Sequence, residues 1–258
     1  MALDYTNRFM RKMAMTVDSS IRIPVICIDK SSIDATEIFH SNSWYGASKG
    51  IIQSCWAEYS VLNFCIRQIT DICHNPERVC REQIKTILHQ WQIKKFDLKK
   101  VTIFSEVTEL HIHIEAFFSE VKTLLDLLVQ LLSSEKIVGV SVNGFHKDKK
   151  VYGGMVINAL SNNALINRKE EAAKIKAIIY EHKSLWIDKA ICARDQLIHP
   201  TKGIHQLMFQ LEFTEKAEGL VFVKANPPEI DSVPIDQYAQ RILRHASAFS
   251  SSFLGLMR

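Results

Sequence analysis

The residues of this sequence best suited to proton transfer and anion binding lie in one short segment, RDQLIH at positions 194–199. An imidazole titrates near neutral pH, and a guanidinium is always cationic and can donate two parallel hydrogen bonds to an anion. Positions five apart on a regular helix differ in direction by about 140°. Arg194 and His199 therefore share a face only if the helix end distorts, which Pro200 makes reasonable because proline disfavours α geometry in the residue before it.

The same segment has a plain structural interpretation. Arg194 and His199 would be two cationic groups at a helix C-terminus, where they interact favourably with the last carbonyls. Asp195 and His199, four positions apart, would form an ordinary surface pair. The six residues alone do not separate a catalytic group from a helix end.

The elements that must position this segment are mostly helical. Apolar residues at three- and four-residue steps predict helices at Ser48–His74, from about Glu77 to about Gln92, from Ser105 through Leu131, from about Arg168 to His199, and at about 235–257. Two alternating runs around TEKAEG predict a β-hairpin at about 205–225. We therefore expect a mainly all-α fold, a helical bundle with a small β-hairpin insert near the C-terminus. It would occupy residues 46–258, after an N-terminal arm or irregular extension at 1–45.

Composition favours a folded, cytoplasmic protein. Hydrophobic residues make up 47% of the chain, enough to bury a core, and a net charge of +4 falls short of a dedicated nucleic-acid binder. The first residues contain no apolar stretch typical of a secretion signal. The most apolar run, Leu124 to Leu132, is too short to span a bilayer, so no membrane association is expected.

The metal-binding residue types form no convincing ligand set. The six cysteines include no C-x-x-C pair and are expected to be reduced packing residues. Cys73, His74 and Cys80 fit no closed zinc site, and in a helix His111 and His113 point apart. Neither a metal nor a cofactor is expected. The phosphate-binding loop of nucleotide hydrolases and the nucleophile elbow of serine hydrolases are both missing from the sequence.

Arginine, a polar residue directly after it and a histidine at the end of a long helix resemble the catalytic motif of HEPN-superfamily ribonucleases. The specific similarity covers only the six residues of RDQLIH. It implies a helical domain that dimerises and brings two copies of the motif into one cleft, where RNA is cut without a metal ion. His199 would then be the general base or acid, Arg194 would stabilise charge on the phosphoryl oxygens, and Asp195 would orient one of them.

On this resemblance we expect a metal-independent endoribonuclease, a homodimer in a toxin or phage-defence setting with an antitoxin or another regulatory protein as a further partner. A non-catalytic HEPN-fold scaffold or dimerisation module is the first alternative, and a helical protein unrelated to that superfamily is the second. Weaker candidates for binding RNA phosphates are Lys147, Lys149, Lys150, Lys202 and His205. A lysine-rich loop is also ordinary solvated surface.

Overall fold

The computed structural model describes residues 46–94, 100–148, 150–198 and 207–257. The expected arm at 1–45 lies outside the described residues, and so do four candidate site residues: Lys149, His199, Lys202 and His205. The described part is mainly helical and carries a small antiparallel sheet, as the sequence predicts.

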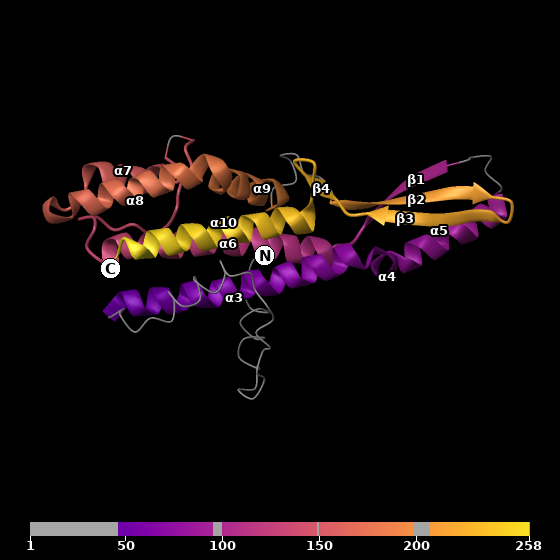
Figure 1. The fold of residues 1–258 in the computed structure, drawn as a ribbon, viewed down its shortest axis with the longest axis horizontal. Helices are drawn as coiled ribbons and strands as arrows, with labels where there is room; N and C mark the ends of the chain where they lie inside the picture. Colours follow the sequence, from indigo (N-terminus) through magenta and orange to yellow (C-terminus); the bar gives the residue numbers. More distant parts are fainter. Residues whose placement is uncertain (1–45, 95–99, 149, 199–206, 258) are drawn as a thin grey trace, which may run out of the picture.

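Three long helices define the length of the molecule: α3 (Gly46–His74), α6 (Thr108–Ser134) and α10 (Ile235–Gly255) (Figure 1). Each buries one apolar stripe with helical spacing, such as Cys55, Leu62 and Ile69 of α3. The interface between α3 and α6 is the most extensive in the fold. The core of the bundle therefore lies along these helices.

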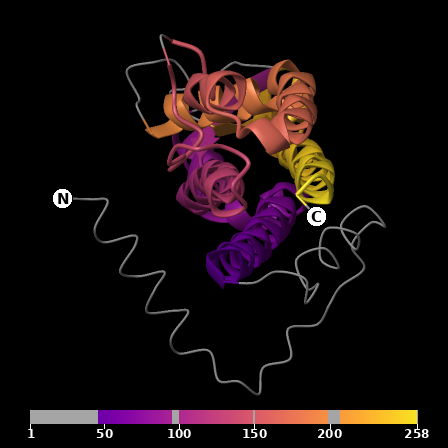
Figure 2. The ribbon, with the colours of Figure 1, turned by 90° about the vertical axis from the view of Figure 1, so that its left-hand side faces the viewer.

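A second helical layer lies on the side of α6 and α10 that is opposite to α3, as Figures 1 and 2 both show. It contains α7 (Gly154–Asn162), α8 (Lys169–His182) and α9 (Asp188–Ile198). The sequence analysis expected no helix in the place of α7.

The predicted long helix before the motif is confirmed, but it is not regular throughout. A π-helical segment, Lys183–Ile187, joins α8 to α9. Within it the indole N–H of Trp186 donates to Nδ1 of buried His182 at 2.9 Å, and both rings pack against Phe249 of α10. The wider turn thus coincides with a buried aromatic cluster against the neighbouring helix.

The hairpin is confirmed as β2 (Met208–Lys216) and β3 (Gly219–Asn226), and a third strand, β1 (Lys100–Glu106), pairs antiparallel with β2. The prediction that Ser105 and Glu106 open a helix is wrong, because they are the last two residues of β1 and α6 begins at Thr108. Both are good helix-start residues locally, but pairing with β2 outweighs that preference.

The break predicted at Asn75-Pro76 is confirmed, but the helix after it is divided into α4 (Pro76–Val79) and α5 (Arg81–Lys94). The Asn75 side chain donates to Asp71 and does not cap α4. Figure 1 shows α5 running alongside the sheet. A short β4 (Glu229–Ile230) and β5 (Val233–Pro234) then turn the chain into α10. No helix in the described ranges is long and apolar enough to cross a membrane.

Candidate functional site

The described part of the RDQLIH segment forms the last turns of α9. Ala190, Ile191 and Ala193 on the same helix are buried, and α9 packs against α6. Arg194 and Asp195 follow this buried face and are partly exposed. The expected position at the C-terminal end of a long helix is therefore confirmed for these two residues, while His199 lies just beyond the described part.

Three donors converge on the carboxylate of Asp195. Its Oδ1 accepts a hydrogen bond from Nη1 of Arg194 at 3.1 Å. Its Oδ2 accepts from the hydroxyl of Tyr152 at 2.9 Å and lies 3.4 Å from the ammonium of Lys147. That ammonium also lies 3.9 Å from the centre of the Tyr152 ring, a cation–π contact. The carboxylate thus joins the end of α9 to the loop before α7.

The hydrogen bonds at Asp195 favour its charged form. Burial raises the pKa of the Asp195 carboxyl, but hydrogen bonds from Tyr152, Arg194 and Lys147 outweigh burial, so its pKa lies below the ordinary value. Burial raises the pKa of the Tyr152 hydroxyl, and its hydrogen bond to Asp195 acts in the same direction. At neutral pH the cluster therefore contains a carboxylate, a neutral phenol and two cations.

Arg194 retains donors for a ligand. The side chain is 33% exposed, and its one ion pair within the described residues is with Asp195. Its Nε is buried and finds no acceptor in the described part of the chain. A guanidinium has five N–H donors in a fixed planar arrangement, so Arg194 can bind an anion while it keeps its bond to Asp195.

The loop that carries Lys147 and Tyr152 is anchored to α6. The backbone N–H of Phe145 donates to Oδ1 of Asp126 at 2.6 Å, and the Phe145 ring is fully buried. At Gly153 φ is +68°, and a Cβ atom would lie 2.2 Å from Cζ of Phe145. Both the left-handed backbone and the close ring require glycine at this position.

The two described candidate phosphate-binding lysines, Lys147 and Lys150, have different surroundings. Lys147 is held by Asp195 and Tyr152 and is not free to bind a phosphate alone. Lys150 is exposed, with a φ of +83°, in a tight turn closed by backbone hydrogen bonds between Asp148 and Val151. The sequence analysis missed Tyr152, for which the single signal was an aromatic residue in a glycine-rich segment.

A second group of cations lies on α9 and α10. Lys189, Arg241 and Arg244 form no ion pair with any carboxylate in the described part of the chain. Burial lowers the pKa of His245, and the positive groups of His182, Arg244, Arg241 and Lys189 lower it further. Three of these side chains therefore form a surface of uncompensated positive charge, called the basic face below: Lys189, Arg241 and Arg244.

The described residues contain no group of three or more His, Cys, Asp or Glu side chains able to hold a metal ion. Cys55, Cys65, Cys73 and Cys80 are buried free thiols, in agreement with a packing role, while Cys192 is exposed. Comparisons of the chain with protein families, with curated proteins and with solved structures found no match. The function is therefore inferred from the chemistry of the site.

Proposed function

We propose that this protein is a metal-independent endoribonuclease of the HEPN type. The observation that carries the proposal is the geometry of Arg194 at the end of α9, where Asp195 holds Nη1 of a side chain that is 33% exposed and whose guanidinium has further N–H donors. An arginine held in this way is suited to the charge that builds on phosphoryl oxygens during phosphodiester cleavage.

The proposed reaction is an internal transesterification of RNA. The ribose 2′-oxygen bonds to the adjacent phosphorus while the bond from phosphorus to the 5′-oxygen breaks, which leaves a 2′,3′-cyclic phosphate and a 5′-hydroxyl. His199 takes the proton from the 2′-hydroxyl or returns one to the leaving 5′-oxygen. Arg194 neutralises the non-bridging oxygens, and Asp195, held by Tyr152 and Lys147, positions Arg194.

The proposal includes a homodimer. On a regular helix, positions five apart, as 194 and 199 are, differ in direction by about 140°. In a two-fold cleft, Arg194 of one protomer would act beside His199 of its partner, which removes this conflict. A toxin or phage-defence role, with a regulatory protein that restrains the nuclease, belongs to the same proposal.

The basic face supports RNA as the substrate. Lys189 lies on the helix that carries Arg194, while Arg241 and Arg244 lie on α10 beside it (Figures 1 and 2). Uncompensated cations attract a phosphate backbone and release its counterions, so RNA binding should weaken steeply as salt rises.

The test is cleavage of a mixed pool of single-stranded RNA and transfer RNA in EDTA. Wild type should cut and leave 2′,3′-cyclic phosphate ends, while Arg194→Ala and His199→Ala should lose at least about a hundredfold in rate. Matched controls are Arg67→Ala on α3 and His89→Ala on α5, two exposed positions outside the site, which should cut like wild type. Cleavage that survives in both site variants would refute the mechanism.

A second candidate function is a non-catalytic scaffold or dimerisation module. It is favoured by the contacts of Asp195 Oδ2, which joins α9 to the loop through Tyr152 and Lys147, since this is also how a purely structural aspartate behaves. A scaffold predicts that folded, dimeric wild type is inert on every RNA in the pool, and that Arg194→Ala changes stability or dimerisation alone.

A further inference from the structure

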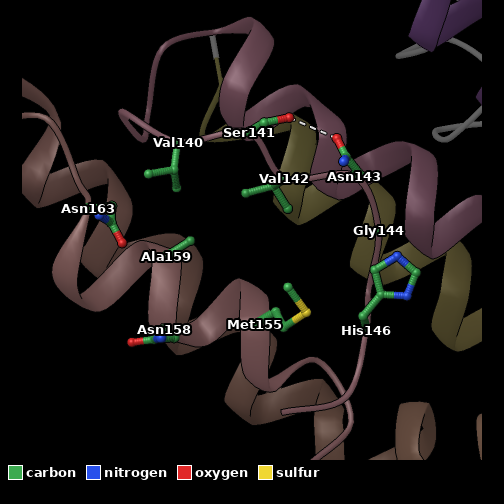
Figure 3. Close-up of a pocket in the computed structure, with 10 residues that line it drawn as sticks. All are labelled: Val140, Ser141, Val142, Asn143, Gly144, His146, Met155, Asn158, Ala159 and Asn163. Atoms are coloured by element: carbon green, nitrogen blue, oxygen red, sulfur yellow. Dashed lines mark hydrogen bonds between the residues drawn. The ribbon is translucent and has the colours of Figure 1, made fainter.

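A hollow of about 290 Å³ lies between the loop segment 140–146 and one face of α7 (Figure 3). Its size is at the lower end of the range for small-molecule sites, roughly 300–1,000 Å³. Val140 and Met155 contribute exposed apolar surface, with 40% and 54% of their areas accessible. Figure 3 shows the side chains of Val142 and Met155 on opposite walls, with His146 beside Met155. The hollow therefore offers apolar surface and an imidazole ring at one end.

Besides the His146 ring, the polar lining of the hollow consists of uncharged groups. They are the Asn143, Asn158 and Asn163 amides and the Ser141 hydroxyl, which donates to Oδ1 of Asn143 at 2.8 Å, while Oδ1 of Asn158 accepts from the side-chain amide of Asn162. Among the described residues, no lysine, arginine, aspartate or glutamate lines this hollow. Amides both donate and accept hydrogen bonds in one plane and so match the edge of a nucleobase, whereas a phosphate would require cations.

Both walls of the hollow are attached to the residues that hold Asp195. His146 directly precedes Lys147, and α7 begins two positions after Tyr152. Consecutive Cα atoms are about 3.8 Å apart, so both walls of the hollow are close along the chain to residues of the Asp195 cluster. The loop lies close to α6 at Gly144. A Cβ atom there would lie 2.8 Å from Oδ1 of Asp126 and 2.8 Å from Nε2 of His146.

We propose that this hollow binds one unstacked nucleobase of single-stranded RNA, next to the phosphate at Arg194. Proteins that read RNA sequence stack splayed bases on flat or apolar side chains and bond their edges with polar groups, which are the two kinds of surface found here. The base so held sets the sequence preference of cleavage. The position of the scissile phosphate in this inference rests on the proposed function, while base binding can be measured without it.

The first test is a titration of the isotope-labelled protein with AMP, GMP, CMP, UMP and, as a probe without a base, ribose 5-phosphate, followed by NMR. At least one nucleotide should shift the resonances of the hollow, while ribose 5-phosphate should leave them in place. Asn158→Ala and Met155→Ala, both at exposed positions, should weaken that nucleotide roughly tenfold. Asn167→Ala, an exposed asparagine outside the hollow, is the matched control and should bind like wild type.

Three outcomes overturn the inference: no shift at the hollow with any nucleotide at millimolar concentration, equal shifts with ribose 5-phosphate, or undiminished binding by both variants. Cleavage assays separate this result from the proposed function. If wild type binds a base but cuts no RNA, the nuclease proposal fails and the base site stands. If wild type cuts RNA and Asn158→Ala has the same sequence preference, the base site fails and the nuclease stands.

Discussion

The α3–α6 interface and the end of α9 each hold a partly buried carboxyl group. The surroundings shift the pKa values of these two groups in opposite directions. Burial, a hydrogen bond with Glu58 and its negative charge together raise the pKa of Glu120, on α6, to about 8. At the end of α9, three donors hold the pKa of Asp195 below its usual value although burial opposes them. One carboxyl is left near a like charge, and the other is fully compensated.

This difference shows that the two regions are stabilised by different forces. The long-helix interface tolerates an acid pair because apolar burial along the whole stripe exceeds its cost. The loop beside α9 has few large buried side chains, and its position depends on Phe145, on two carboxylates and on glycines that admit close contacts. We therefore expect global stability and site geometry to respond to separate substitutions.

Phe117→Ala should show how strongly apolar burial stabilises the α3–α6 region. Phe117 of α6 is fully buried, and its ring meets Phe118 edge to face at 5.3 Å between centroids. The substitution should lower the free energy of unfolding by about 3–5 kcal/mol, through lost burial and a residual cavity. Urea unfolding followed by circular dichroism measures it. Phe64→Ala on α3, where the ring is 48% exposed, is the control, and a cost equal to that of Phe117→Ala would contradict the argument.

Gly153→Ala tests the loop. The left-handed backbone and the overlap with the Phe145 ring should cost about 2–4 kcal/mol, or displace the loop and relieve the clash. In either case amide hydrogen exchange should increase in the segment 140–153, and RNA cleavage should fall together with it.

Gly50→Ala is the matched control for this glycine. Gly50 lies inside α3, and a Cβ atom there meets nothing within 4 Å. Alanine should therefore stabilise the protein by up to about 1 kcal/mol without changing loop exchange. An unchanged exchange pattern in Gly153→Ala would show that the loop does not depend on this contact.

Glu120→Gln tests the other carboxyl. The folded protein keeps a proton that the unfolded chain has already released, so the free energy of unfolding should fall as pH rises from the ordinary value of 4.5 to about 8. Glutamine remains neutral throughout. Above that range it should be more stable than wild type by about 1–2 kcal/mol, a figure reduced for the solvent that still reaches the pair.

Urea unfolding at pH values of about 5, 7 and 9 measures this slope. Glu115→Gln, at an exposed position of the same helix, should retain the pH dependence of wild type. Equal slopes for wild type and Glu120→Gln would show that the Glu58–Glu120 pair does not cause the pH dependence of stability.

Local sequence patterns predicted the parts of the fold that depend on local periodicity. The apolar repeat Cys55, Leu62 and Ile69 predicts α3 because each of these side chains enters the same core stripe. The hairpin was predictable because the turn and both strands are adjacent in the sequence. In both cases neighbouring residues alone carry the signal.

Two of the features that were missed depend on residues distant in the sequence. Ser105 becomes part of a strand because Phe209 pairs with it, and no pattern near Ser105 encodes that partner. Tyr152 reaches Asp195 only after the loop is anchored to α6. The motif could therefore be located from the sequence, but the residues that hold it could not.

Asp195→Asn should have a smaller effect on stability than Phe117→Ala or Gly153→Ala. The folded-state pKa of Asp195 is depressed, so its contribution to stability is present above the unfolded-state value of 3.8 and is lost as pH falls through the lower folded-state value. At neutral pH the substitution should cost about 1 kcal/mol, because asparagine keeps one acceptor oxygen but not the charge. Asp71→Asn, which alters the exposed pair with Arg78, should cost less.

Since Asp195 holds Lys147 and Tyr152, its substitution should also increase amide exchange across the segment 140–153 while exchange in α3 stays unchanged. If Asp195→Asn leaves amide exchange in the segment 140–153 as slow as in wild type, Phe145 and the glycines fix the loop without Asp195. The proposed role of the Asp195 charge in holding the loop would then be wrong.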